Sequence, residues 1–418
     1  MEKLLMSKNG IPVYSYVNSS QNSFFISLFL RAGSMFECES GVTHFFEHVA
    51  IRNINYVMSG ELYAILDRFG LEFNASTSNE MVQFYITGAK KHIRLGADII
   101  VRVLDEIKLP KSEIDRERDR IRAEIREVDD ASSLAGFTAS KLYAGTKLQR
   151  SITGTLGSVA KIGKRSLERF RKETLVRENL FLYVSGNASD EDIAHLASLV
   201  EGYDVPSGKK NENTAPVPSN FGKRDAAVLV KRADFTKVRF NFDVDMSRVS
   251  LPELDLLYDQ LLGGYNSEFF IELSERRGIF YDLTGSVERY ENIGVFSFNY
   301  EVKEARLEEA LRVTVDILRR FKARVIPKHE LITAGYIDNA MMLYDDSREL
   351  NFTFAYDNHI MSSGYTDIPD RRSAYERVTP ERIRAAAEVI FTPANLTLTM
   401  KGKRGIDPDK LREILLTL

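Results

Sequence analysis

The chain of 418 residues lacks the features that define several common protein classes. It has a single cysteine, Cys38, so it cannot form an internal disulfide, which fits a reducing compartment and a cytoplasmic location. Its formal net charge is −3, which does not favour nucleic acid or an anionic membrane as a partner. No apolar run reaches the length of about 20 residues that spans a membrane, and the start, "MEKLLMSKNGIPVY", has no apolar run typical of a signal peptide.

The length of the chain predicts more than one domain. Hydrophobic residues make up 44% of the chain and charged residues 28%, as in ordinary globular proteins, yet 418 residues exceed what one typical core holds. The stretch "SGKKNENTAPVPSNFGKR" is polar, with two prolines and two glycines, and is the best linker candidate. We therefore expect an N-terminal domain at 1–206, a linker at 207–224 and a C-terminal domain at 225–418.

The order of predicted elements repeats after the linker. A strand followed by a helix is predicted at 80–104 and again at 292–318, and a helix followed by a strand at 168–186 and again at 381–402. The stretches "ENLFLYVSG" and "ANLTLTMKG" share an Asn-Leu start, alternation and a final glycine. This repetition predicts an α+β fold of two duplicated domains of about 200 residues, each a mostly antiparallel sheet packed with helices.

The stretch "GVTHFFEHVA" at 41–50 holds two of the six histidines. Residues three and four apart share one helix face, so His44, Glu47 and His48 project together. Two imidazoles at this spacing can hold one zinc ion, and the carboxylate between them can accept a proton from a water that zinc activates. H-x-x-E-H is the inverted zincin signature. The alternative is an amphipathic helix with incidental histidines.

A catalytic zinc also needs a third protein ligand and an open position. The other four histidines are poor candidates for this ligand and are predicted to be surface or capping residues. They are His92, His195, His329 and His359. That leaves a carboxylate, and the charged helix predicted at 111–130 carries Glu113, Asp115, Glu117, Asp119, Glu124 and Glu127. From spacing alone this run is a solvated face on which no member stands out, although Glu117 and Glu124 share a face two turns apart.

Longer stretches around these motifs carry a resemblance to a known family. They are "LRAGSMFECESGVTHFFEH" (30–48), "GLEFNASTSNEMVQFY" (70–85), "ERDRIRAEIREVDD" (117–130) and "LERFRKETLVRENLFLYVSGN" (167–187). Together they resemble the pitrilysin/insulinase family of zinc peptidases in its half-length form, which includes bacterial processing peptidases and the mitochondrial processing peptidase. The resemblance runs over nearly the whole chain and implies a zinc metalloendopeptidase that hydrolyses peptides or unfolded segments.

The resemblance also implies a role for each residue of the metal site. The family's ligands match His44, His48 and Glu124 here, for one Zn²⁺ per chain. The family's general base matches Glu47, and a supporting glutamate matches Glu117. Since Glu117 shares a face with Glu124, it can orient the ligands from behind. Glu127 remains a rival for the third ligand.

The resemblance places substrate contacts in both halves. Asn74 and Ala75 match an edge strand to which an extended peptide adds, although Asn74 by itself would be interpreted as a turn residue. In the second half, Tyr281 matches a tyrosine that polarises the scissile carbonyl. Ser274 stands where the family often has an arginine, and the nearby "RR" at 276–277 is out of register.

Half-length family members pair as two subunits around a chamber, and some pairs divide the zinc and the arginine–tyrosine pair between them. The missing arginine therefore predicts the zinc-bearing subunit of a heterodimer, with a homodimer as the alternative. Two other functions stay open: a non-catalytic peptide-binding or scaffold subunit, and a protein with a structural zinc. Retention of the H-x-x-E-H residues argues against the first, and structural zinc sites usually use cysteine, of which the chain has one.

Overall fold

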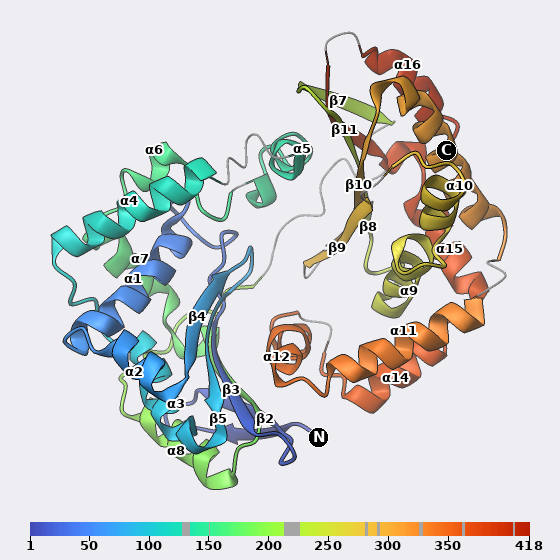
Figure 1. Cartoon of the computed structure of the whole chain (residues 1–418). Helices are drawn as coiled ribbons and strands as arrows, with labels where there is room; N and C mark the ends of the chain where they lie inside the picture. The colour runs from blue at the N-terminus through green and yellow to red at the C-terminus, as the bar shows by residue number, and fades with distance from the viewer. Residues whose placement is uncertain are drawn as a thin grey trace. The chain divides into compact units, whose positions relative to one another are not determined.

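The computed structural model describes residues 1–127, 134–149, 151–212, 226–280, 283–290, 293–325, 329–361, 364–403 and 406–418 (Figure 1). The chain divides into two compact units. The first comprises Met1–Asp129, Lys147–Asn213 and Met342–Ile368, and the second comprises Asp130–Thr146, Thr214–Met341 and Pro369–Leu418. Each unit thus includes a segment from the other half of the chain. The predicted domain boundaries stay a prediction, because residues 213–225 lie outside the described part.

The first unit is built on a six-stranded sheet with the order β1-β2-β6-β3-β5-β4. Its strands are β1 (Lys3–Met6), β2 (Pro12–Val17), β3 (Ser23–Leu30), β4 (Glu72–Thr77), β5 (Val82–Ala89) and β6 (Leu180–Gly186). All pairings are antiparallel except β2 with β6. β4 lies at one edge of the sheet, and among the described strands it pairs with β5 alone.

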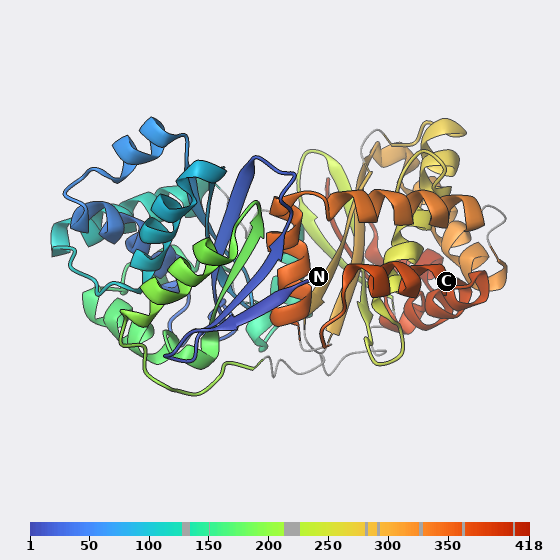
Figure 2. The ribbon, with the colours of Figure 1, turned by 90° about the horizontal axis from the view of Figure 1, so that it is seen from below.

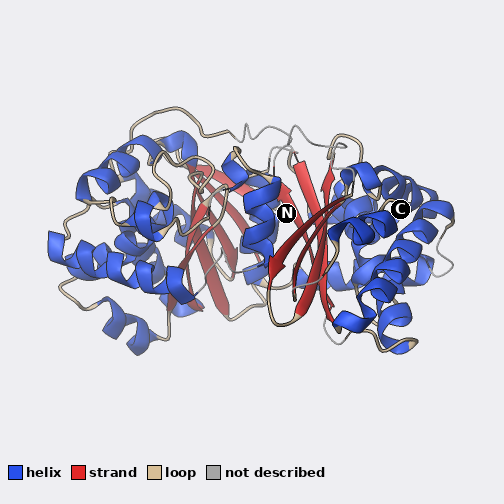
Figure 3. Cartoon of the chain, turned by 90° about the horizontal axis from the view of Figure 1, so that it is seen from above, coloured by secondary structure: helices blue, strands red, loops and turns tan. Residues whose placement is uncertain are grey.

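Helices cover this sheet, as the colouring by secondary structure shows (Figure 3). They are α1 (Val42–Val57), α2 (Leu62–Phe69), α3 (Ile93–Ile100), α4 (Lys111–Glu127), α6 (Leu156–Val159), α7 (Lys164–Thr174) and α8 (Asp190–Glu201). Short 3₁₀ turns flank them: η1 (Lys90–His92), η2 (Val101–Leu104), η3 (Lys147–Gln149) and η4 (Arg177–Asn179). Apolar side chains of α1, α3, α7 and α8 join those of the strands in one large core.

The opposite face of the sheet is covered by the segment from the second half of the chain. This segment folds as α12 (Ser347–Glu349), the π-helical η7 (Leu350–Phe354) and α13 (Ala355–His359). Leu350 and Phe354 pack there against Phe29 of β3 and Phe181 of β6. Burial on both faces explains why "SFFISLFL" and "LFLYVSG" are almost continuous apolar runs rather than alternating ones.

The second unit repeats the first. Its strands are β7 (Ala227–Arg232), β8 (Thr236–Val244), β9 (Leu283–Tyr290), β10 (Ile293–Val302) and β11 (Thr397–Gly402), in the order β7-β11-β8-β10-β9. That order matches β2-β6-β3-β5-β4 position by position, and β7 with β11 is again the parallel pair. The matching sheets confirm the predicted α+β class with duplicated, mostly antiparallel sheets (Figure 2).

The sheet of the second unit is also packed with helices. They are α5 (Leu134–Leu142), α9 (Leu251–Leu262), α10 (Leu307–Ala323), α11 (His329–Leu343), α14 (Ile368–Glu376), α15 (Pro380–Ile390) and α16 (Pro408–Leu415), with the π-helical η5 (Phe270–Glu275) and the turns η6 (Glu304–Arg306) and η8 (Pro393–Asn395). α5 comes from the first half, and its Thr138 bonds Thr399 of β11. Among the described residues, no helix is both long and apolar enough to cross a membrane.

Candidate metal centre

The helix that carries both histidines begins at a fixed point. Gly41 precedes α1 in the left-handed region at φ 87°, and a Cβ there would lie 2.8 Å from the carbonyl oxygen of Thr153. The buried carboxylate of Glu37 accepts hydrogen bonds from the backbone N–H of Gly41 at 2.8 Å and of Thr43 at 3.3 Å. This carboxylate caps the positive end of the helix and sets where its first turn starts.

α4 packs against α1 and brings one of its carboxylates to the histidines. Glu124 Oε1 lies 3.5 Å from His44 Nε2, and Glu124 Oε2 lies 3.6 Å from His48 Nε2. Among the described residues, His44, His48 and Glu124 form the one group of three whose donor atoms could hold a metal, all within 4.8 Å of one another. Glu127, the rival ligand, is exposed and not part of it.

These separations fit a zinc ion. Ligands held about 2.0–2.1 Å from a tetrahedral zinc are about 3.3 Å apart from one another, close to the two nitrogen–oxygen distances found. Burial, with a smaller contribution from His48, lowers the pKa of His44 to about 4, so its imidazole is neutral, as a ligand must be. Two imidazoles and one carboxylate are a donor set typical of catalytic zinc, which keeps one further position open.

A second carboxylate of α4 contacts His48 on the ring nitrogen that faces away from Glu124. Glu117 Oε2 lies 3.4 Å from Nδ1 of His48, and its side chain is only 5% exposed. Burial would raise the pKa of Glu117, but the hydrogen bond to His48 and the charges of Arg120 and Arg52 hold it below its usual range. An ionised Glu117 accepts the Nδ1 proton of His48 and so presents Nε2 towards Glu124.

Arg52 ties this arrangement to the rest of α4. Its guanidinium donates to Glu113 Oε2 at 2.6 and 2.9 Å and lies 3.8 Å from Glu117 Oε1. The ion pair crosses from α1 to α4, so it holds the two helices in register near the metal site.

Glu47 of α1 lies beside the same group, close enough to His48 and Glu124 for their charges to act on it. Its carboxylate is buried and accepts a hydrogen bond from the hydroxyl of Thr77, the last residue of β4. Burial raises the pKa of Glu47, although the Thr77 hydrogen bond and His48 oppose the rise. A buried carboxyl with a raised pKa next to a metal site is suited to proton transfer near neutral pH.

The edge strand β4 begins at Glu72 and ends at this carboxylate. Asn74 is exposed and pairs with Tyr85 of β5, and Ala75 is half-buried and pairs with Phe84. Because no described strand pairs with the other side of β4, its backbone can accept a further strand. Asn74 therefore lies in a strand and not in a turn, as the family resemblance implied and its residue type alone did not.

The sequence-predicted contacts of the second half are only partly described. Tyr281 lies outside the described residues. Ser274 is half-buried in η5. Arg276 donates to Glu272 Oε1 at 2.7 Å, and Arg277 Nε lies 3.9 Å from Glu272 Oε2. Both arginines are therefore engaged by a carboxylate of their own helix.

Of the other histidines, His329 is buried and His359 is half-buried, and each lies at the end of a helix. His329 begins α11, where its Nδ1 lies 2.8 Å from Gln260 Nε2 and its Nε2 lies 3.2 Å from the carbonyl oxygen of Val378. The ring of His359 stacks on Tyr14 with centroids 3.7 Å apart. Polar neighbours in sequence did not reveal these contacts, because the partners lie far away along the chain.

The candidate residues thus separate into those that lie together and those that do not. His44, Glu47, His48, Glu117 and Glu124 form one cluster in the first unit, with Thr77 as a member that sequence reasoning missed. The signal for Thr77 was its place three residues after Asn74 at the end of an edge strand. The roles of these residues in catalysis stay a prediction.

Comparisons with known proteins match most of the chain to one family. Residues 13–156 match the family described as insulinase (peptidase family M16), and residues 161–334 match the peptidase M16 inactive domain. The chain is 20% identical over 398 residues to an uncharacterised zinc protease of Bacillus subtilis, covering 94% of this chain and 96% of the relative.

Solved structures share the fold over the whole chain. A protease from Helicobacter pylori has a TM-score of 0.82 at 18% identity, covering 96% of this chain and 99% of that one. A putative M16-like peptidase from Alicyclobacillus acidocaldarius has a TM-score of 0.82 at 17% identity, covering 96% and 98%.

Proposed function

The chain belongs to the insulinase family, peptidase family M16, and on that premise we propose that it is a zinc-dependent endopeptidase acting on peptides or unfolded segments. The observation that carries the proposal is the convergence of His44, His48 and Glu124, with the buried carboxylate of Glu47 beside them. The uncharacterised relatives named zinc proteases support it. Helical spacing alone could not select Glu124, so its position is independent support.

The residues of the first unit divide the work. A bound zinc ion would supply a Lewis acid that activates water and stabilises negative charge on the scissile carbonyl oxygen. Glu47 takes the proton of the attacking water and delivers it to the leaving amine. Glu117 holds the ring of His48. The substrate lies along β4 as an added strand, with Asn74 and Ala75 beside it. Because β4 ends at Thr77, which bonds Glu47, the scissile bond of such a substrate lies close to Glu47.

The proposal extends to a partner subunit. Ser274 replaces the arginine that many relatives use to hold substrate, and Arg276 and Arg277 are occupied by Glu272. We therefore propose that this chain is the zinc-bearing subunit of a pair, with a half-length relative supplying the arginine–tyrosine pair, inside a chamber that admits unfolded segments. A homodimer that uses Tyr281 is the alternative. The single cysteine supports a cytoplasmic location.

The second candidate function is a non-catalytic peptide-binding or scaffold subunit of such a complex. The match of residues 161–334 to a domain described as inactive favours it, because that half lacks the motif. One experiment separates the two functions. The full chain, purified alone and with a co-expressed half-length relative, is analysed for zinc and incubated with an unfolded protein substrate. One zinc per chain and cleavage that a chelator abolishes support the peptidase; zinc-free, inactive protein in both preparations contradicts it.

A further inference from the structure

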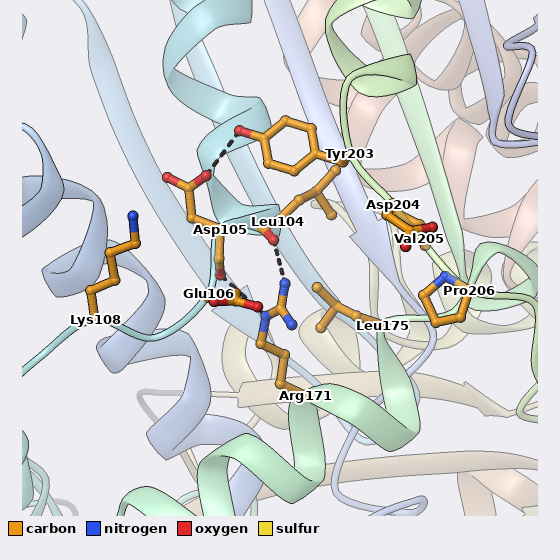
Figure 4. Close-up of a pocket in the computed structure, with 10 residues that line it drawn as sticks. All are labelled: Leu104, Asp105, Glu106, Lys108, Arg171, Leu175, Tyr203, Asp204, Val205 and Pro206. Carbon is orange, nitrogen blue, oxygen red and sulfur yellow. Dashed lines mark hydrogen bonds between the residues drawn. The ribbon is translucent and has the colours of Figure 1, made fainter.

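Among the pockets of the described residues, two in the first unit lie apart from the metal site, and they differ in charge. One, of about 420 Å³, lies between η2, α7 and the end of α8 (Figure 4). Its polar groups bond mainly within the protein: Tyr203 donates to Asp105 Oδ1 at 3.1 Å, and Arg171 donates to the carbonyl oxygens of Leu104 and Asp105, while Asp105 Oδ2 has no hydrogen-bond partner among the described residues. These hydrogen bonds connect neighbouring secondary-structure elements, and the pocket indicates no ligand.

The other pocket, of about 450 Å³, is lined by cations. Arg31, Arg177 and Lys210 line it from the end of β3, from η4 and from the segment after α8, while Glu178 is the one carboxylate among its lining residues. Glu178 Oε1 accepts from the hydroxyl of Ser207 at 2.5 Å and its Oε2 from the N–H of Gly208 at 2.7 Å, so this carboxylate keeps its negative charge and offsets one of the three cations. The pocket therefore has an excess of positive charge.

Arg177 has hydrogen-bonding capacity left over. Its Nε is buried and has no hydrogen-bond partner among the described residues. The guanidinium packs against the turn at Gly10, where φ is +84° and a Cβ would lie 3.5 Å from Cδ of Arg177. A buried N–H without an acceptor is costly, but this atom is closed to solvent, so a ligand in the pocket would meet the other N–H groups of Arg177.

The remaining wall of the pocket includes the rings of Tyr14, Phe181 and His359 and comes from both halves of the chain. Tyr14 of β2 contacts Phe181 edge-on at 5.8 Å and stacks on His359 of α13. His359 is held in turn by Glu2, whose carboxylate oxygens lie 3.0 and 3.1 Å from Nε2. Arg31 donates to the carbonyl oxygen of Ile360 at 3.0 Å, so this cation of the pocket also holds the end of the segment 347–360.

From this arrangement we propose that the first unit binds a small phosphate-bearing anion in the pocket of Arg31, Arg177 and Lys210. Three cations favour a multiply charged phosphate over a singly charged carboxylate, and guanidinium groups bind phosphate oxygens through paired N–H groups. The aromatic wall suits a flat organic group attached to the phosphate, while free phosphate needs only the cations. Because the segment 347–360 supplies part of the pocket, bound anion stabilises its attachment to the sheet. This inference is independent of the proposed peptidase activity.

The test is calorimetric titration of the full chain at constant ionic strength with inorganic phosphate, pyrophosphate, AMP and acetate. The titrations are repeated in His44→Ala with a chelator present, so that phosphate bound to metal does not contribute. We expect one saturable site per chain for pyrophosphate in both proteins and none for acetate. AMP at least about tenfold tighter than inorganic phosphate identifies an organic phosphate as the source, and equal affinities identify free phosphate.

Matched variants place the site. Arg177→Met should weaken pyrophosphate binding at least about tenfold, the loss expected for a charge-assisted hydrogen bond. Lys210→Met, at an exposed position that does not endanger folding, should weaken it about threefold or more. The controls Arg165→Met and Lys172→Met remove exposed cations of α7 and should bind as the wild type does. Hydrogen exchange of residues 347–360 should slow when pyrophosphate is added.

Several outcomes would overturn the proposal. One is the absence of saturable binding by any phosphate probe. Another is a loss of pyrophosphate affinity in the α7 controls equal to that in the pocket variants. A third is unchanged pyrophosphate affinity in both Lys210→Met and Arg177→Met when both variants are folded. Loss of peptidase activity in His44→Ala with retained pyrophosphate binding would leave the proposal standing, so its failure and the failure of the proposed function can be told apart.

Discussion

The hydroxyl of Thr77 donates a hydrogen bond to the carboxylate of Glu47. Thr77 ends the edge strand β4, and Glu47 lies in the middle of the histidine helix α1, 30 residues away in sequence. The bond joins the strand on which a peptide would lie to the group that would move its proton. The position of the Glu47 carboxylate and its pKa therefore both depend on the edge strand β4.

Replacing Thr77 should reduce turnover without loss of metal. Thr77→Val removes the hydroxyl but keeps the shape, so we expect zinc content and melting temperature close to wild type and kcat lower by about tenfold, as for one lost hydrogen bond to a charged group. Thr77→Ser, which keeps the hydroxyl, is the matched control and should retain most activity. Wild-type turnover in Thr77→Val would mean that the bond does not position Glu47.

Glu47→Gln should abolish proton transfer while leaving the site assembled. The amide keeps the size of the side chain and can still accept from Thr77, so folding and zinc content should not change. Hydrolysis of an unfolded peptide should fall by at least about a hundredfold, the lower range for removal of a general base. Near wild-type cleavage by the zinc-loaded variant would overturn the assigned role.

Loss of the third ligand should release the metal. Glu124→Gln leaves two histidines, which hold zinc poorly, and elemental analysis after dialysis should show well below one zinc per chain. Glu127→Gln, one turn further along α4 and exposed, is the matched control and should keep the ion. Unchanged zinc in Glu124→Gln with loss in Glu127→Gln would exchange the two assignments.

The serine at position 274 should limit the isolated chain. Serine cannot place a positive charge or a paired set of N–H donors near the substrate carbonyl, and one such donor is worth about a hundred- to a thousandfold in turnover. We expect zinc-loaded but slow protein whose rate rises with Ser274→Arg or with a co-expressed half-length relative. The rate is measured on unfolded peptides, with the oligomeric state determined in the same buffer. Rapid turnover by a homodimer, unaffected by Ser274→Arg, would contradict divided labour.

Stability of the second unit should depend on the ionisation of Asp259 in α9. Burial raises the pKa of this carboxyl from 3.8 to about 6. A raised pKa favours the protonated form in the folded state, so the stability it contributes is complete below about pH 4 and is lost as the pH rises through about 6. Asp259→Asn should therefore stabilise the chain at pH 8, by about 1 kcal/mol after allowance for solvent screening, and have no effect at pH 4.

Thermal unfolding at the two pH values measures this difference. Asp234→Asn, at an exposed position in the loop between β7 and β8, is the control and should change neither melting temperature. Equal stabilisation by Asp259→Asn at pH 4 and pH 8 would show that packing, and not ionisation, is responsible.

The sequence by itself determined the local elements of this protein. The pattern along the chain predicted the charged helix at 111–130, which contains α4, and the strand and helix at 80–104, which contain β5 and α3. The i, i+3 and i+4 spacing placed His44, Glu47 and His48 on one face before any fold was known. The repeated order of strands and helices gave the duplicated sheets. All of these depend on neighbours within a few residues, which the chain order records directly.

The tertiary structure decided what depends on contacts between distant segments. Spacing left the carboxylates of α4 equivalent, and only the packing of α4 on α1 brings Glu124, and not Glu127, within 3.5 Å of His44 Nε2. The contact of Thr77 with Glu47, the burial of His329, the stacking of His359 on Tyr14, and the exchange of Met342–Ile368 into the first unit arise in the same way. Such contacts reflect complementary shape and charge between surfaces that are separated by up to hundreds of residues, and no local period encodes that complementarity.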